Sequence, residues 1–444
     1  MELVRCYRFV TLVKERLIHK ILIQYNKGIQ MSLLYTIAAK LRKQPKLKRL
    51  LKNVYQYIGQ IASDRETSPA SIKCVSNTKY EHLFGYYDKS PWNKNGDRII
   101  YLRVKNASKV TASDIPAEII IKDVMTEIET SIATTRSWNV QQGCMLQWLG
   151  PDFETKIIFN DFRRGKYCAV IFSINTKEER IIDAPVYSVS QDGKLALTLD
   201  FSRLHTLRPG YGYMNVHDST KDQKCPKSPC IWAIDLVTNR VIPLLTYKQL
   251  FDFEHKDSMN RAFHKVNHIM INPSGTRFMF LHRWIKNGVK YDRLLTCKMD
   301  GKDMYNLLDE DMVSHCNWKD DNTIITYAHT YEFGDHYYIL HDKSSKREVD
   351  KNLPDVDGHP SYSPNGKYII TDSYPNFRRK QRLYLYDIQT QLCKQIAEVY
   401  SSKPYINDTR CDLHPRWKRD SSEICFDGAQ GKYRQVYTLK ISNW

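Results

Sequence analysis

Acidic residues are nearly missing from the first sixty positions, where Glu2 and Glu15 stand against 13 lysines and arginines. An excess of 11 positive charges therefore lies in this segment, out of a net charge of +18 for the whole chain. Such an asymmetry indicates a basic appendage on a nearly balanced body. Because no compact nucleic-acid-binding motif accompanies the basic residues, we expect no specific binding of DNA or RNA.

Long hydrophobic runs are also missing, because charges such as Arg5, Arg8 and Lys14 interrupt each apolar stretch near the N-terminus. This pattern predicts neither a signal peptide nor a membrane-spanning helix. The 11 cysteines include no C-x2-C pair, and several fall in or beside apolar runs, as buried free thiols do. We therefore expect a reduced, cytoplasmic protein, with association to membranes left open.

Apolar residues recur at helical spacing within the first sixty positions, and a tight basic cluster follows at residues 42–49. This pattern predicts a basic α-helical N-terminal extension over residues 1–65, made of two or three amphipathic helices. Two interpretations remain open. Residues 1–60 could make a peripheral contact with anionic lipid or an acidic partner, or they could pack on the rest of the protein with their charges in water.

From residue 80 onwards, short apolar segments alternate with turns such as Asn95-Gly96 and Asp192-Gly193. Seven such segments align, most of them spaced near the roughly 40–50 residues of a propeller blade. One blade cannot bury both faces of its sheet, so the blades must stack around an axis. The pattern predicts an all-β protein with a seven-bladed β-propeller over residues 80–444. The blades are expected to begin near Tyr86, Gly143, Pro185, Asn267, Ser314, Gly358 and Leu413.

A histidine occupies the same position in four consecutive repeats, at His268, His315, His359 and His414. The first strand of each propeller blade lines the central channel, and ligands bind at one mouth of that channel. We therefore expect four imidazoles to converge on one axis, where neutral imidazoles suit a divalent metal ion. The alternative is that the blade itself prefers a polar residue there and that the histidines are structural.

Other polar residues are expected to contact a substrate near this axis. Histidines follow His268 and His315 by fourteen residues, and the segment 203–213 is rich in arginine, tyrosine and glycine. Arginine clamps carboxylates and tyrosine stacks on sugar rings, so this segment suits a carboxylated sugar. The alternative is a plain surface loop. The candidate substrate-binding residues are Lys89, Gln142, Tyr213, His282 and His329.

The stretches VNHIMINPSGTRFMFLHRW, VSHCNW and DGHPSYSPNGKYIITDSY, all within residues 262–375, resemble the oligogalacturonate lyases. The resemblance implies a seven-bladed propeller that cleaves uronate oligosaccharides by β-elimination with a divalent metal, Mn²⁺ or a similar ion. In that family three histidines and a glutamine hold the metal. His315 and His359 match two of those histidines, whereas Asp357 replaces the third and Pro354 stands at the glutamine position.

The resemblance also implies a base that removes a proton from the uronate, which in such lyases is thought to be an arginine. The candidates here are Arg208 first, Arg203 second, and Tyr211 as a tyrosine alternative. The metal set implied by the resemblance and the repeats together is His268, His315, His359, His414 and Asp357.

Three functions are therefore open. The first is a metal-assisted lyase-like enzyme acting on a uronic-acid-containing oligo- or polysaccharide. The second is a non-catalytic propeller that binds a glycan or a protein, with structural histidines. The third is a hydrolase or transferase of another class on the same scaffold, because propellers host many functions.

Overall fold

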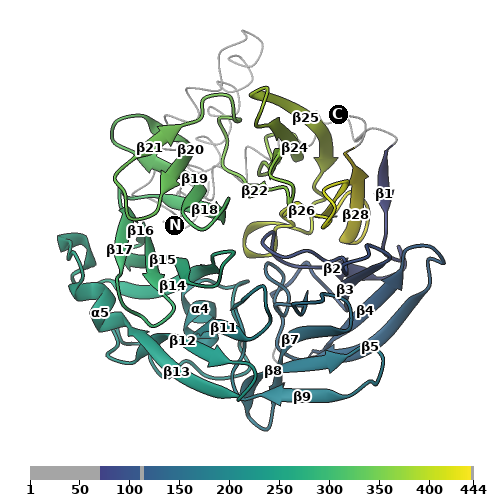
Figure 1. Ribbon diagram of the computed structural model, residues 1–444, viewed down its shortest axis with the longest axis horizontal. Helices are drawn as coiled ribbons and strands as arrows, with labels where there is room; N and C mark the ends of the chain where they lie inside the picture. Colours follow the sequence, from purple (N-terminus) through teal and green to yellow (C-terminus); the bar gives the residue numbers. More distant parts are fainter. Residues whose placement is uncertain (1–70, 111–114, 442–444) are drawn as a thin grey trace, which may run out of the picture. The chain divides into compact units, whose positions relative to one another are not determined.

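Seven four-stranded antiparallel sheets make up the part of the chain that the structure, a computed structural model, describes, namely residues 71–110 and 115–441. Figure 1 shows these sheets arranged as successive blades around a common centre. The expected seven-bladed β-propeller is confirmed. All described residues belong to one compact unit, Tyr55–Trp444. The predicted helical extension over residues 1–65 lies outside the described residues.

The first three blades follow one another along the chain, each with its innermost strand first. Blade 1 contains β2 (Glu81–Leu83), β3 (Arg98–Val104), β4 (Ala117–Asp123) and β5 (Glu129–Thr135). Blade 2 contains β6 (Gln147–Trp148), β7 (Lys156–Arg163), β8 (Lys166–Ser173) and β9 (Glu179–Ile182). Blade 3 contains β10 (Ser188–Val189), β11 (Leu195–Leu199), β12 (Pro229–Asp235) and β13 (Arg240–Thr246).

The next three blades repeat this order. Blade 4 contains β14 (Phe263–Ile271), β15 (Arg277–Lys286), β16 (Val289–Lys298) and β17 (Tyr305–Leu308). Blade 5 contains β18 (Val313–Trp318), β19 (Thr323–Thr330), β20 (Gly334–His341) and β21 (Arg347–Val349). Blade 6 contains β22 (Ser361–Tyr362), β23 (Tyr368–Asp372), β24 (Lys380–Asp387) and β25 (Leu392–Tyr400).

Blade 7 joins the two ends of the propeller. It contains β26 (Arg416–Trp417), β27 (Glu423–Gly428) and β28 (Gln435–Lys440), and its fourth strand is β1 (Ile72–Cys74). Strand β1 pairs antiparallel with β28, with Ile72 opposite Leu439. The ring is therefore closed by hydrogen bonds between strands from opposite ends of the sequence, and this closure leaves no open first or last blade.

Each blade packs on two neighbours, so its middle strands are buried on both faces. In β3 every residue from Ile99 to Leu102 has an exposed fraction of 0%, and Phe278 to Leu281 in β15 are equally buried. This burial explains why the second strands read as short continuous apolar runs rather than as alternating patterns.

The aromatic residue three positions after the histidine of several repeats connects neighbouring blades. Trp318 donates a hydrogen bond from Nε1 to the Met270 carbonyl at 3.0 Å, and Trp417 donates to the Ser361 carbonyl at 3.1 Å. Trp148, at the matching position of blade 2, donates to the Pro91 carbonyl at 2.9 Å. A buried indole needs a partner for its N–H, and the preceding blade supplies it.

Short helices lie in the connections of blades 3, 4 and 7. They are α4 (Phe201–Leu207), α5 (Tyr247–Asp252), η2 (Asp257–Met259) and η3 (Asn407–Thr409). The segment 203–213, which could have been a plain loop, is helical as far as Leu207, with Asp200 capping the helix by accepting from the Arg203 N–H at 2.9 Å. Among the described residues no helix is long and apolar enough to span a membrane.

A buried carboxylate ties blade 7 to the connections of blades 1 and 2. Asp427 accepts from Arg416 Nη1 at 2.9 Å and from Arg434 Nη2 at 2.6 Å, and all three side chains are fully buried. Arg416 also donates to the carbonyl of Gly85 at 2.8 Å, and Arg434 donates to that of Val140 at 2.5 Å. One carboxylate therefore orients two guanidiniums that hold backbone from two other blades.

Replacing Asp427 by asparagine should destabilise the propeller by roughly 3–5 kcal/mol, because it leaves two buried guanidiniums without their counter-ion. Denaturant unfolding followed by tryptophan fluorescence measures this loss. The control is Asp420→Asn in the same blade, where an exposed ion pair with Lys418 contributes at most about 1 kcal/mol. Equal stability of the two variants would contradict the role assigned to Asp427.

Stability should also depend on pH through the buried imidazole of His82 in β2. Burial lowers the pKa of His82 from 6.5 to about 4. Between pH 6.5 and 4, His82 is protonated in the unfolded chain but neutral in the folded chain. The free energy of unfolding is therefore highest above pH 6.5 and falls as the pH drops towards 4. The loss amounts to about 3 kcal/mol at 1.36 kcal/mol per pKa unit. It should shrink in His82→Gln and persist in His217→Gln, an exposed site.

Candidate metal centre

The four histidines of the repeat position lie together at the centre of the propeller. Their ring centroids are 5.2 Å apart for His268 and His315, 4.0 Å for His315 and His359, and 4.3 Å for His359 and His414. All four residues are at most 5% exposed. Four consecutive blades thus place one imidazole each into a single buried cluster.

The backbone of the blades sets the direction of two of these histidines. His268 and His414 adopt positive φ values of 54° and 46°, a conformation that costs free energy for a residue with a Cβ atom. Met145, at the same position of blade 2, has a φ of 57°. The left-handed conformation therefore belongs to the blade architecture and is not specific to histidine.

Two of the imidazoles form a hydrogen bond through one ring nitrogen, while the other ring nitrogen has no partner among the described residues. His359 Nδ1 lies 2.8 Å from Asp372 Oδ1, and His414 Nδ1 lies 2.8 Å from the Gly85 carbonyl. Both acceptors require a proton on Nδ1, which leaves the lone pair on Nε2. Neither Nε2 atom has a hydrogen-bond partner among the described residues, although both atoms are buried. An oriented imidazole with an orphaned Nε2 is the usual state of a metal ligand before the ion binds.

Asp372 and Gly85 are the residues that orient the two rings. Asp372 accepts from the backbone N–H groups of His359 at 2.8 Å and His414 at 3.1 Å, in addition to the His359 ring. Gly85 has a φ of +129°, and a Cβ atom there would lie 2.6 Å from the Gln142 carbonyl oxygen. Only glycine fits this close approach, which brings its carbonyl to His414.

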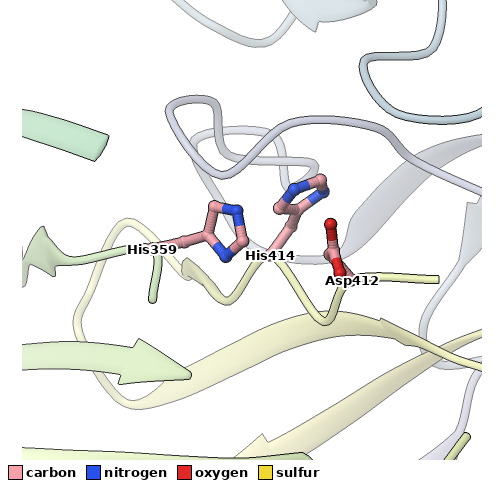
Figure 2. A group of neighbouring side chains, drawn as sticks. All are labelled: His359, Asp412 and His414. Carbon is pink, nitrogen blue, oxygen red and sulfur yellow. The ribbon is translucent and has the colours of Figure 1, made fainter. Parts of the chain in front are cut away.

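Asp412 is a ligand candidate that the repeat alignment missed. Ligand atoms of His359, Asp412 and His414 all lie within 4.8 Å of one another, and Figure 2 shows the two rings and the carboxylate side by side. Arg410 donates to both oxygens of Asp412 and fixes the orientation of the carboxylate. The signal in the sequence was the spacing D-x-H, which occurs at Asp412 and again at Asp357.

The other two histidines have different surroundings. His315 Nδ1 lies 3.0 Å from Ser314 Oγ and 3.4 Å from Asp357 Oδ1. Asp357 is thus beside the histidine cluster, as expected, and burial raises the pKa of its carboxyl group to about 6. Both ring nitrogens of His268 lie within 2.9 Å of the Tyr86 hydroxyl.

The cluster favours neutral imidazoles at most positions. Burial lowers the pKa of His268, His315 and His414 well below the usual value, and the other histidines lower it further. For His359 burial acts in the same direction, but the carboxylates of Asp372, Asp412 and Asp357 together outweigh it and raise the pKa. Neutral rings are the form that binds a metal ion.

The Tyr86 ring lies near all four imidazoles. Its ring centroid lies 5.0 Å from that of His414 and 5.2 Å from that of His268, with the other two histidines within 6.5 Å. Tyr87, next in sequence, donates to the Cys316 carbonyl at 2.7 Å and ties blade 1 to blade 5.

Arg203, the second candidate base, lies buried among backbone carbonyls. It is 0% exposed and donates to the backbone carbonyls of His264, Thr220, Gln223 and Lys224. Its guanidinium also lies 5.1 Å from the Tyr247 ring centroid. These contacts make Arg203 an anchor for the long connection between β11 and β12.

Three of the expected substrate contacts lie in other networks. His282 bridges His264 and Arg293 inside blade 4, at 2.9 and 3.1 Å. Tyr213 stacks on Phe201 in the core. His329 bonds to Asp335 at 2.6 Å and joins no contact with the histidine cluster in the described part of the chain. His282 and His329 therefore have different partners, although each follows a histidine of the cluster by fourteen residues.

The remaining candidates lie near the cluster. Lys89 donates to Asp88 at 2.6 Å, and its ammonium lies 6.0 Å from the Tyr187 ring centroid. Gln142 donates to the Tyr187 hydroxyl at 2.7 Å, and that hydroxyl accepts from the His268 N–H at 3.2 Å. These two residues thus contact the cluster through Tyr187.

Arg208 and Tyr211 form a separate pair, with the Arg208 guanidinium 4.8 Å from the Tyr211 ring centroid. Burial opposes the positive charge on Arg208, but the Tyr211 side chain outweighs it and raises the pKa of the guanidinium. Gly210 between them approaches the Asp408 carbonyl so closely that a Cβ atom would lie 2.5 Å from it. The connection of blade 3 therefore reaches the segment of blade 7 that carries Asp412.

The different surroundings of the two arginines make a prediction about stability. Arg203→Ala should lower the free energy of unfolding by roughly 3 kcal/mol or more, because several buried carbonyls lose their donor. Arg208→Ala, in the same connection, should cost clearly less than Arg203→Ala, because the contact that it removes is with the Tyr211 ring. Thermal and denaturant unfolding measure both effects, and a stable Arg203→Ala variant would refute the anchoring role.

Comparison with known proteins extends the description of the fold. No protein-family model matches the chain, and no curated protein sequence matches it. Among solved structures, an oligogalacturonate lyase in complex with manganese is 14% identical, with a TM-score of 0.62 over 84% of this chain and 95% of the other. An oligogalacturonate lyase from Vibrio parahaemolyticus is 11% identical, with a TM-score of 0.58 over 85% and 96%.

This chain has a fold similar to that of oligogalacturonate lyases. The resemblance noted in the sequence is thereby confirmed for the architecture. At 11–14% identity the likeness concerns the fold, so the chemistry of this chain must be argued from its own residues.

Proposed function

We propose that this protein is a metal-assisted, lyase-like enzyme that cleaves a uronic-acid-containing oligo- or polysaccharide by β-elimination. The observation that carries the proposal is the pair of buried, orphaned Nε2 atoms of His359 and His414 beside the Asp412 carboxylate. Two oriented imidazoles and a carboxylate suit a divalent first-row ion such as Mn²⁺. The similarity in fold to a lyase that contains manganese agrees with this choice.

The residues of the centre fit such an ion. His359, His414 and Asp412 would hold it, and the His315 ring lies 4.0 Å from that of His359 on the other side. Asp357 would act through His315 as a residue that orients the ring, since it lies on the Nδ1 side. A bound divalent ion would neutralise the uronate carboxylate and so make the C5 proton more acidic.

The remaining groups supply binding and proton transfer. Arg208 keeps its positive charge next to Tyr211, which suits it to clamp a carboxylate rather than to remove a proton. We assign the removal of the C5 proton to the phenolate form of Tyr211. As the C4=C5 bond forms and the C4–O bond breaks, the resulting phenol returns this proton to the oxygen of the departing 4-linked sugar. No water attacks in an elimination, so the mechanism needs no pair of carboxylates at glycosidase spacing.

The alternative is a propeller that binds a glycan or protein without turnover. The observation in its favour is His268, whose two ring nitrogens both face the Tyr86 hydroxyl, as in a structural hydrogen-bond network. The two proposals differ in what they require of His359 and His414, because a structural role does not need their Nε2 atoms.

Alanine at His359 or His414 should abolish metal binding and lower the rate of elimination at least about 100-fold, because each removes a ligand. Elemental analysis of the purified protein measures the metal. The ultraviolet absorbance of the unsaturated product, with uronate oligomers as substrate, measures the reaction. Circular dichroism establishes that each variant is folded.

The matched control is His329→Ala, a histidine outside the centre that should keep both metal and activity. A wild-type protein without metal and without elimination, combined with unfolding of the His359→Ala variant, would favour the structural role. Metal binding without cleavage of uronates would support the metal centre but contradict the proposed elimination reaction.

A further inference from the structure

We propose that blade 4 carries an oxyanion site, formed by Lys265 and Lys290 beside the metal centre, that binds a carboxylate or sulfate group. In the proposed reaction this group belongs to a sugar next to the one that is cleaved. The inference rests on the proposed function only where it identifies the bound molecule as a sugar that carries this carboxylate or sulfate. The oxyanion site itself is argued from the charges and contacts of blade 4.

The strand register places the two lysines on one face of the sheet. Lys265 in β14 is opposite Arg283 in β15, which is opposite Asp292 in β16. Lys290 lies two residues before Asp292 on the same strand. Since side chains alternate between the faces of a strand, all four residues point to the same side of blade 4.

Lys265 has an unusual environment for an ammonium group. It is 1% exposed, and its hydrogen bond within the described residues goes to the Leu207 carbonyl at 3.4 Å. Burial lowers its pKa well below the usual value, and the charges of Arg208, Arg283 and Lys290 lower it further. This environment favours the neutral amine when no anion is bound, whereas an anion beside Lys265 would favour the protonated, charged form.

The acidic groups near Lys265 are already engaged. Asp292 forms ion pairs with Arg283 Nε at 2.7 Å and with Lys290 Nζ at 3.2 Å, so two cations share its one negative charge. Asp357, across the interface in the segment before β22, accepts from Ser314 Oγ at 2.8 Å. Positive charge therefore exceeds negative charge around Lys265, which favours an incoming anion.

Lys290 makes the site accessible from solvent, and Arg283 connects it to the strand that carries His315. The Lys290 side chain is 41% exposed, so a ligand can reach its ammonium group. Arg283 and Lys290 are both among the charges that lower the pKa of His268, a member of the histidine cluster. Arg283 also donates to the Val313 and Ser314 carbonyls at 3.1 and 3.3 Å, which fixes blade 4 against the strand that carries His315.

Inorganic sulfate is the first probe, titrated calorimetrically into the full-length protein at low ionic strength. Lys290→Met should bind it about tenfold more weakly, a loss of roughly 1.4 kcal/mol, because a direct charge partner is removed. The matched control is Lys298→Met, which removes the same charge from the far end of β16 at a side chain 56% exposed. Binding by this control should stay within about twofold of the wild type.

Lys265→Met provides a second readout. Sulfate should stabilise the wild type by mass action in a thermal unfolding experiment, and this gain should be lost in Lys265→Met but kept in Lys298→Met. The Lys298→Met control also accounts for the general stabilisation of proteins by sulfate. If Lys265→Met does not fold, the calorimetric comparison of Lys290→Met with Lys298→Met decides.

The source of the oxyanion group is tested with trigalacturonate, its methyl ester, and a sulfated disaccharide. Tighter binding of the free acid than of the ester, lost in Lys290→Met, assigns a carboxylate, and the same pattern with the sulfated sugar assigns a sulfate. Equal sulfate affinity of Lys290→Met and the wild type overturns the oxyanion site, whether or not uronates are cleaved. Binding through Lys290 without elimination would leave the site standing and defeat the proposed function instead.

Discussion

The arrangement of the centre depends on the buried ion pairs of Asp427 with Arg416 and Arg434. Through Arg416 they hold the Gly85 carbonyl, and that carbonyl orients the ring of His414. Arg416 also donates to the carbonyl of Tyr86, whose ring lies against all four histidines. A carboxylate in the last blade thus controls the position of groups contributed by the first, because buried charges tolerate only a narrow set of partners.

The candidate metal centre combines this rigid support with buried polar atoms that have no hydrogen-bond partner in the described part of the protein. His359 and His414 each have one nitrogen fixed by a backbone or carboxylate oxygen and one nitrogen orphaned. In blade 4, Lys265 is buried with one long hydrogen bond to a backbone carbonyl. Proteins rarely leave several buried polar atoms unsatisfied in one region, and such atoms commonly mark the place where a ligand completes the structure.

The sequence predicted the propeller because blade repeats impose a period on turns and apolar runs, and the same period aligned the four histidines. It could not show that Arg203 and Arg208 have different roles, because the two side chains have the same chemistry. Their surroundings differ because Arg203 lies within the helix α4 and Arg208 follows its end. It missed Asp412 because the alignment followed one position per blade, while the ligand candidate lies two residues earlier. The role of Lys265 depends on contacts between strands and could not be read from the repeat.

The pairing of β1 with β28 has a consequence for how the chain reaches its final state. Ile72 and Leu439 are neighbours in the sheet but lie at opposite ends of the propeller sequence. A chain growing on the ribosome must hold one blade incomplete until nearly all of its residues have emerged. Contacts over such long sequence separations slow folding, so a stalled or truncated chain would expose strand edges that invite aggregation.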